Sequence, residues 1–383
     1  MILHNLDKTQ KSVSLELIEA VEKNFLPQSI LFSGPSGSSR LTAALDLSFH
    51  LTGEDEKRST LSSSQIIFFP SRNLVSQKDA AISLFDRQRT KASRLFLLET
   101  VRTILFQYHP ALISAYSSSI SSYFASAEEI GRAIMEFEED REYTEKEIKA
   151  LLKLLKDKLT SQFIMKGRRT QTVSIDEIRA VQKYFSTGQD EKVVIIENLE
   201  ESNEGAKNSL LKLLEEPNEH SHIILISSNP QRLLQTILSR VRKFTFPALS
   251  DKQVTKLLSE RFSLYRGYDS FESFFFEEGT GEEERKRLVD SASKFASILY
   301  SGKVMDREDE EDLLMLIESS SYFRYFRNRV ADNLRKMLME GGNALKIRRL
   351  TDIMNKWSGA SDIYNLSQRV ALDSILREAQ NVK

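Results

Sequence analysis

Residues 193–247 read VVIIENLEESNEGAKNSLLKLLEEPNEHSHIILISSNPQRLLQTILSRVRKFTFP, and this stretch decides the fold. Its first four residues are apolar and β-branched, which predicts a short buried strand. Leucines then recur at helical spacing until Pro217, which cannot continue a helix, and residues 223–226 form the next apolar run. A helix between two buried strands predicts an α/β fold in which helices flank a parallel sheet.

The same stretch carries a more specific pattern in its helix and near its end. Residues 208–217 read NSLLKLLEEP, and Ser239, Arg240 and Val241 follow beyond the next strand. This order of residues resembles the AAA+ subunits of the bacterial sliding-clamp loader, whose helix ends Asn-x-Leu-Leu-Lys-x-Leu-Glu-Glu-Pro ahead of a Ser-Arg-Cys. Val241 departs from that pattern. The resemblance is strong over residues 171–250, and it implies an AAA+ core.

A second nucleotide-binding element follows the apolar run SILFS and reads GPSGSSRL from Gly34. A working P-loop needs a glycine at its sixth position so that backbone amides can surround the phosphates, then a lysine for the outer phosphates and a hydroxyl for magnesium. Ser39, Arg40 and Leu41 stand at those three positions, while Gly34 and Gly37 are kept. Arginine binds phosphate differently from lysine, and a leucine side chain cannot hold a metal. We therefore expect a degenerate P-loop.

The resemblance places another altered element, the Walker B position, at the end of the strand that begins at residue 193. In active relatives this strand ends in an aspartate that helps to hold magnesium and a glutamate that activates water. Glu197 and Asn198 stand there in this chain, and asparagine cannot act as a general base. Because two halves of one site are altered, we expect a chain that does not hydrolyse ATP and needs no cofactor. Ser228 and Asn229 fall in the family's sensor region and are expected to be polar residues at a strand end.

The resemblance gives Ser239 and Arg240 a catalytic role outside their own chain. In the family this arginine projects into the nucleotide site of the neighbouring subunit, where an arginine finger stabilises charge on the transferred phosphoryl group. A surface arginine in a basic cluster with Arg242 and Lys243 remains the alternative. A degenerate P-loop joined to an intact Ser-Arg is most like the delta-prime subunit of the DNA polymerase III clamp loader.

This resemblance implies partners and a place in DNA replication. The expected hetero-oligomer contains gamma/tau-type motor subunits and a delta-type subunit, and it acts on the sliding clamp and primer-template DNA. The chain itself is expected to be a non-catalytic subunit of the polymerase holoenzyme. Two alternatives remain open. One is an ATP-hydrolysing gamma/tau-type motor of the same complex, and the other is an AAA+-derived interaction protein outside replication.

Composition excludes several other classes of protein. Lysine plus arginine (54) nearly balances aspartate plus glutamate (55), so no global basic field indicates a stand-alone DNA-binding protein. There is no cysteine, which excludes disulfides and the four-cysteine zinc ribbon that clamp-loader AAA+ subunits usually carry. The five histidines form no ligand set, so no metal is expected. No apolar run approaches the ~18 residues of a membrane span, and a cytoplasmic protein is expected.

The expected organisation has three domains: an AAA+ core at 1–248, a small helical lid at 249–302 and an all-α collar at 303–383. The core contains a helical insertion at about 72–170, which the resemblance does not explain. Its acidic run from Glu136 to Glu147 and the basic loop of Lys166, Arg168 and Arg169 are expected to be solvated faces. Binding of partners or DNA is the alternative for both. A serine-rich break is predicted at residues 117–122. Strands are predicted at residues 29–33, 65–69, 193–196, 223–226 and 243–246.

Two aromatic segments of the C-terminal half admit a structural or a nucleic-acid-binding interpretation. Phe271 and the run from Phe274 to Phe276 are expected to form core rather than a base-stacking platform. In the segment YFRYFRNR, residues 322–329, aromatic rings alternate with arginines. Such rings can stack on single-stranded nucleic acid, but the spacing also fits a helix with one buried aromatic face, which we favour.

Overall fold

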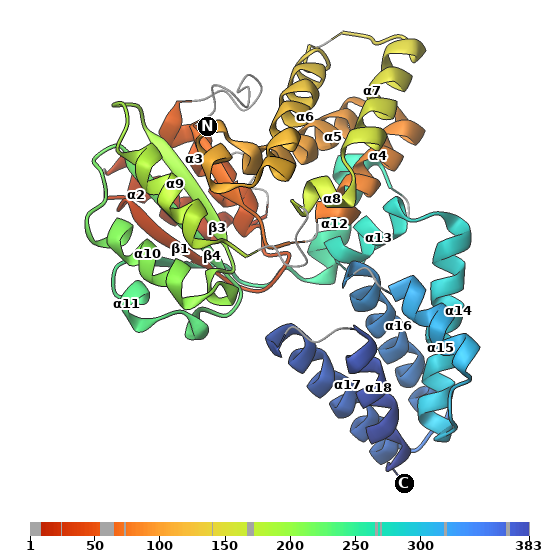
Figure 1. Cartoon of the computed structure of the whole chain (residues 1–383). Helices are drawn as coiled ribbons and strands as arrows, with labels where there is room; N and C mark the ends of the chain where they lie inside the picture. Colours follow the sequence, from red (N-terminus) through yellow and green to blue (C-terminus); the bar gives the residue numbers. More distant parts are fainter. Residues whose placement is uncertain are drawn as a thin grey trace. The chain divides into compact units, whose positions relative to one another are not determined.

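The computed structural model describes residues 9–23, 25–53, 65–72, 74–139, 141–166, 172–264, 267–268, 270–317, 320–364 and 368–382. The chain forms two compact units, residues 1–271 and 272–383. Each unit is described by itself, with the elements labelled in Figure 1. The finer division into core, lid and collar stays a prediction.

In the described part of the chain, five parallel strands form one sheet in the first unit, in the order β2-β3-β4-β1-β5. The register places Phe69 opposite Ile196 and Ser29 opposite Ile223. Every run predicted as a strand is confirmed to within about two residues at each end, as expected for boundary assignments. The strands are β1 (Ser29–Ser33), β2 (Ile66–Phe69), β3 (Lys192–Glu197), β4 (Ser221–Ser227) and β5 (Arg242–Thr245).

Helices flank this sheet, which confirms the predicted α/β class. Successive strand residues point to opposite faces, and one face carries Ile30, Phe32 and their counterparts on the other strands in a single apolar cluster. Helix α3 contacts β1, β3 and β4, and α9 packs against α10. These core helices are α2 (Lys11–Glu22), α3 (Arg40–Thr52), α9 (Ile175–Phe185), α10 (Glu204–Glu215) and α11 (Gln235–Leu238).

The predicted helical insertion is confirmed as a group of helices, drawn in orange and yellow in Figure 1. Its elements are α4 (Leu74–Gln88), α5 (Lys91–Leu105), η1 (Phe106–Tyr108), η2 (Pro110–Ala115), α6 (Ser118–Met135), α7 (Glu145–Lys158) and α8 (Ser161–Ile164). The predicted break at residues 117–122 is wrong for most of its length, because Ser117 is the N-cap and α6 begins at Ser118. Serine is favoured at helix starts as well as in loops. Phe106 joins the apolar cluster on the sheet, so the insertion completes the core.

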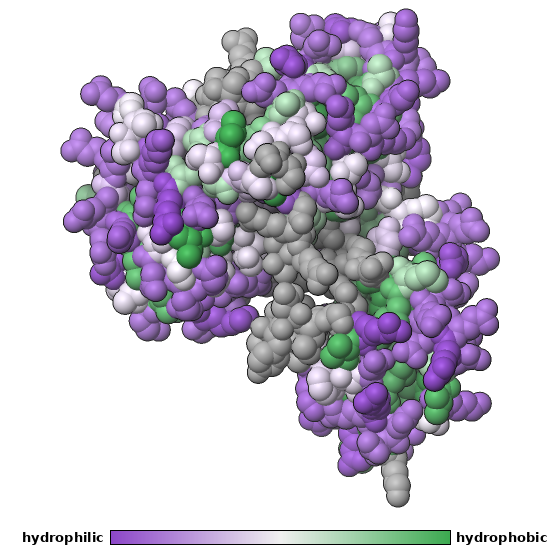
Figure 2. Space-filling model, viewed as in Figure 1, coloured by the Kyte–Doolittle hydropathy of each residue, from purple (hydrophilic) through white to green (hydrophobic). Residues whose placement is uncertain are grey.

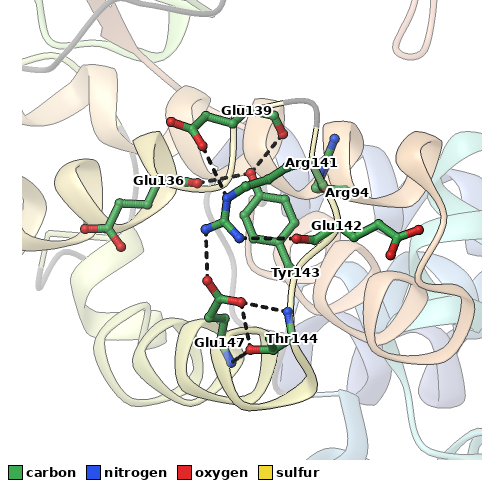
Figure 3. A network of polar contacts seen from close by, with 8 residues as sticks. All are labelled: Arg94, Glu136, Glu139, Arg141, Glu142, Tyr143, Thr144 and Glu147. Atoms are coloured by element: carbon green, nitrogen blue, oxygen red, sulfur yellow. Dashed lines mark hydrogen bonds and ion pairs between the residues drawn. The ribbon is translucent and has the colours of Figure 1, made fainter.

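In the acidic run between α6 and α7, the described residues make local contacts around Tyr143. The ring of Tyr143 stacks on Phe137 with centroids 4.4 Å apart, and the guanidinium of Arg141 lies 4.1 Å from its centroid. Arg141 also donates to Glu147 at 2.9 Å, while Thr144 caps α7 through a reciprocal bond with Glu147 (Figure 3). The hydrogen bond from Arg141, followed by those from Thr144, lowers the pKa of Glu147 to about 2. Local pairing therefore stabilises this loop despite its excess of acids.

The prediction that the basic loop is solvated is wrong for Lys166. This residue is 5% exposed, and its Nζ lies 3.2 Å from Oε1 of the fully buried Glu177. The same Nζ donates to the Tyr116 hydroxyl at 2.5 Å. A buried lysine needs such partners because an unpaired charge is costly to bury. Arg168 and Arg169 lie outside the described residues.

Every described element of the second unit is a helix. Ser250 caps α12 (Asp251–Phe262) at the end of the first unit, as the sequence predicts. In the second unit Phe323, Tyr325 and Phe326 are buried, which confirms the buried aromatic face. Phe274 and Phe276 are buried as predicted. The helices are α13 (Phe271–Gly279), α14 (Glu282–Ser301), α15 (Arg307–Ile317), α16 (Ser320–Met339), α17 (Ala344–Tyr364) and α18 (Gln368–Gln380).

The surface is mainly hydrophilic on the face drawn in Figure 2, where apolar side chains lie in small scattered groups. Scattered apolar residues are normal on a folded domain and need no ligand to explain them. Among the described residues no helix is long and apolar enough to cross a membrane.

Candidate functional site

The backbone between β1 and α3 keeps the course of a glycine-dependent loop. A Cβ atom on Gly34 would lie 2.3 Å from the carbonyl oxygen of Phe246, so no other residue fits there. Gly37 has φ 74° and Ser39 has φ 65°. The left-handed region favours glycine and costs other residues about 1 kcal/mol or more. Ser39 therefore adopts the conformation expected of the glycine that it replaces.

Arg40 is the first residue of α3, and its side chain is buried in the edge of the sheet. The residue is 6% exposed, and its Nη2 donates to Ser228 Oγ at 3.0 Å. Its Nη1 is buried with no hydrogen-bond partner among the described residues. Burial, followed by the positive charge of Arg72, lowers the pKa of Arg40 to about 10, so the guanidinium stays charged at neutral pH. Leu41 packs into the apolar cluster on the sheet.

At the end of β3, the carboxylate of Glu197 is bound by the residues that follow β2. Arg72 forms an ion pair with it, and Nε of Arg72 lies 2.8 Å from Oε1 and 3.1 Å from Oε2. The amide of Ser71 donates to Oε2 at 3.1 Å. Asn198, in a left-handed conformation, donates through Nδ2 to Ser71 Oγ at 3.1 Å. The two predicted Walker B residues are therefore engaged by their own chain.

The end of β4 is tied to the short helix η3 (Leu199–Glu201). Ser227 Oγ donates to Glu200 Oε1 at 2.6 Å, and the Asn229 amide donates to the same oxygen at 3.3 Å. Oε2 of the buried Glu200 has no hydrogen-bond partner among the described residues. In the predicted sensor region, Ser228 contacts Arg40, while Asn229 contacts Glu200 through its backbone.

The predicted finger residues lie after α11, where their contacts are with α10 and α11. The Arg240 side chain is 32% exposed, and its Nη2 lies 2.8 Å from Oε1 of Glu215, whose side chain is 48% exposed. Nη1 donates to the Thr236 carbonyl at 2.7 Å, and Ser239 Oγ donates to the same carbonyl at 3.1 Å. These bonds, together with a longer one from Nη1 to Ser239 Oγ at 3.4 Å, fix the direction of the guanidinium at the surface.

Three residues of this region were missed by the sequence reasoning: Arg72, Glu200 and Glu215. Arg72 lies three residues beyond the apolar run IIFF, and the carboxyl ends of neighbouring parallel strands meet at one edge of the sheet. That rule predicts that Arg72 and Glu197 are close. No comparable pattern marks Glu200 or Glu215, because their partners depend on how α10, η3 and β4 pack.

Two histidines share one carboxylate at the amino ends of β3 and β4. His220 Nδ1 and His222 Nε2 each lie 3.0 Å from an oxygen of Glu191. Burial lowers the pKa of His222. In the parts of the chain that the structure describes, no group of three or more His, Cys, Asp or Glu residues is arranged to hold a metal ion.

Comparison with known proteins gives one family match and several partial relatives. A family profile described as DNA polymerase III, delta subunit, matches residues 116–250. The chain is 42% identical over 88 residues to DNA polymerase III subunit delta' of Bacillus subtilis, covering 22% of this chain and 27% of that protein. It is 30% identical over 143 residues to subunit tau of the same organism, covering 35% and 24%. It is 53% identical over 49 residues to subunit delta' of Pseudomonas aeruginosa, covering 13% and 15%.

The matches thus span about a quarter or less of the length of these relatives. A solved gamma subunit-related protein of Thermotoga maritima is 19% identical, with 56% of this chain and 81% of that chain covered and a TM-score of 0.33. The fold assignment rests instead on the observed order of the parallel strands. The sequence matches thus make this chain similar to clamp-loader subunits of DNA polymerase III, with delta' among them, over the matched residues.

Proposed function

We propose that this chain is a subunit of the DNA polymerase III clamp loader that does not hydrolyse ATP and that supplies Arg240 to a neighbouring motor subunit. It supports loading of the sliding clamp onto primed DNA in the cytoplasm. Its partners are gamma/tau-type motor subunits and a delta-type subunit. The chain is no enzyme by itself, because its contribution to ATP hydrolysis is made in the nucleotide site of another subunit.

The first support is that its own pocket does not fit magnesium and nucleotide. Leu41 offers no hydroxyl and is buried in the apolar cluster, while both oxygens of Glu197 are bound by Arg72 and Ser71. Asn198 has no basic group to activate water. Two metal-binding positions and the base are therefore lost together.

The observation that carries the proposal is the placement of Arg240. Its guanidinium is at the surface, oriented by the Thr236 carbonyl and by one carboxylate oxygen of Glu215. A nucleotide bound by a neighbouring subunit offers a stronger partner for a guanidinium than an exposed carboxylate. Its phosphate groups carry several negative charges and can accept two parallel hydrogen bonds from one arginine. Arg240 then needs only to exchange Glu215 for phosphate, and folding of its own chain is unaffected.

The test is ATP hydrolysis by the reconstituted complex, stimulated by clamp and primed DNA, with Arg240→Ala in this subunit. An arginine finger contributes roughly 10³ to 10⁵ in rate at the site that it serves. Because the other motor sites keep their own fingers, total turnover is expected to fall partially, and clamp loading more strongly if the sites act in order. The matched control is Arg232→Ala, an exposed arginine on η4 (Pro230–Arg232).

Three outcomes contradict the proposal in different ways. Unchanged turnover in an intact complex makes Arg240 an ordinary surface arginine. Steady ATP turnover by the isolated wild-type chain favours the motor alternative. Failure to co-purify with gamma/tau-type subunits favours the interaction protein outside replication.

A further inference from the structure

The arrangement around Glu197 gives Arg72 a role that no motif of the sequence indicates. The Glu197 side chain is 4% exposed, so its negative charge requires compensation. Arg72 supplies it from the end of the neighbouring strand through Nε, which contacts both oxygens, and through an ion pair. The Ser71 amide completes the set of donors.

This carboxylate lies where a P-loop protein would place its cation. It ends a strand at the carboxyl edge of a parallel sheet, which is where such folds bind ligands, and a strand-end carboxylate beside a P-loop holds magnesium. A divalent cation beside Glu197 would need at least one oxygen lone pair and room for its waters. The Arg72 guanidinium occupies lone pairs of both oxygens, because its Nε contacts Oε1 and Oε2.

A second guanidinium adds to the positive charge of the pocket. Arg40 is buried beside Ser228, and the charge of Arg72 is near enough to act on it. Glu197 and Glu200 both stabilise the charged form of Arg40. The charges of Arg40 and Arg72 therefore face those of Glu197 and Glu200 within the chain itself.

We infer that Arg72 acts as a built-in cation that takes the magnesium position beside Glu197 and thereby excludes magnesium-nucleotide from this pocket. The P-loop substitutions weaken phosphate binding, and Arg72 blocks the metal independently of them. The inference concerns the isolated chain, so it stands whether or not the chain works in a clamp loader.

The test uses the full chain in two forms. The first has a restored loop, with Ser39→Gly, Arg40→Lys and Leu41→Thr. The second adds Arg72→Ala to the restored loop. Binding of a fluorescent ATP analogue is measured by anisotropy with magnesium present. We expect the second form to bind at least about tenfold more tightly than the first, because a full charge is removed from the metal position.

A second measurement isolates the metal from the nucleotide. In the otherwise native chain, Arg72→Ala leaves the Glu197 carboxylate without its arginine partner, while the Ser71 amide still donates to it. The variant is expected to have a lower melting temperature, and millimolar magnesium is expected to restore part of the loss. The double variant with Glu197→Gln has no such charge and is expected to show no response to magnesium. Arg179→Ala is the matched control, because Arg179 and Asp176 form an exposed ion pair with Nη1 and Oδ1 3.3 Å apart.

If Arg72→Ala does not fold, Arg72→Gln replaces it in both measurements, since glutamine keeps a hydrogen bond to Glu197 without the charge. The inference is overturned if the restored loop binds the analogue equally well, or equally poorly, with and without Arg72. It is also overturned if magnesium stabilises Arg179→Ala as much as Arg72→Ala.

Discussion

Arg40 and Arg240 are arginines in two regions of one unit, and they differ in burial and in the kind of partner that they bind. Arg40 is buried and bonded to Ser228 of its own sheet, while Arg240 is one-third exposed and bonded to a surface carboxylate. Burial commits a guanidinium to its own chain, because leaving it unpaired is costly. Exposure leaves it free to change partners. The charged groups around Arg40 are thus bound within their own chain, while the exposed guanidinium of Arg240 can be reached by another molecule.

The first prediction tests the difference between buried and exposed charges at the ion pair of Lys166, in the insertion, with Glu177, in α9. Lys166→Ala removes the lysine that pairs with the buried carboxylate of Glu177, although Ser174 and Tyr116 still donate to it. We expect a loss of about 3 kcal/mol in the free energy of unfolding, measured by urea denaturation. Lys158→Ala is the control, because Lys158 and Glu129 form an exposed pair worth about 0–1 kcal/mol.

The variant Lys166→Met with Glu177→Gln removes both charges, and it is expected to recover much of that loss. Equal costs for Lys166→Ala and Lys158→Ala would contradict the distinction between buried and exposed pairs.

The second prediction concerns the buried arginine of the P-loop. Arg40→Ala removes the donor to Ser228 and the positive charge near Glu197 and Glu200, and we expect a loss of about 2 kcal/mol in stability. Arg40→Lys keeps the charge but not the fork of donors, so its loss is expected to be smaller. Chemical denaturation of the full chain measures both. A loss for Arg40→Ala below about 0.5 kcal/mol would mean that the pocket does not depend on its internal charge.

The sequence predicts features that depend on neighbouring residues better than contacts between residues that lie far apart in the chain. The strand that ends at Glu197, the N-cap Ser250 and the helix that ends at Glu215 follow from spacing and end residues alone, and all are confirmed. The partners of these residues do not follow. Arg72 meets Glu197 across 125 positions of sequence, and Lys166 is buried because the insertion returns to α9. Such contacts are set by packing.

The third prediction is a dependence of stability on pH at the opposite edge of the sheet. Burial is the first cause that lowers the pKa of His222, with Glu191 acting against it. The folded pKa lies below the unfolded value of about 6.5, so the stability gained from the neutral ring is present above that pH. It is lost as the pH falls from about 6.5 through the folded pKa. The melting temperature of His222→Gln is expected to change less with pH over this window than that of the wild type. A slope that is unchanged by the substitution would assign the effect to other groups.

The smallest effect on stability is expected for Arg240→Ala, the residue on which the proposed function depends most. Its guanidinium contacts an exposed carboxylate and one carbonyl, and surface substitutions of this kind change stability by about 0.5 kcal/mol or less. Urea denaturation of the isolated chain measures this. Glu215→Gln weakens the same ion pair while Arg240 is kept, so its stability is also expected to be near that of the wild type. The two variants separate in the assembled complex. If Arg240 acts as the proposed finger, Arg240→Ala is expected to lower ATP hydrolysis by the complex. Glu215→Gln keeps the arginine and loosens its ion pair, so it is expected to retain turnover. A loss of more than about 2 kcal/mol for Arg240→Ala would show that this arginine supports its own fold, and the contrast with Arg40 would fail.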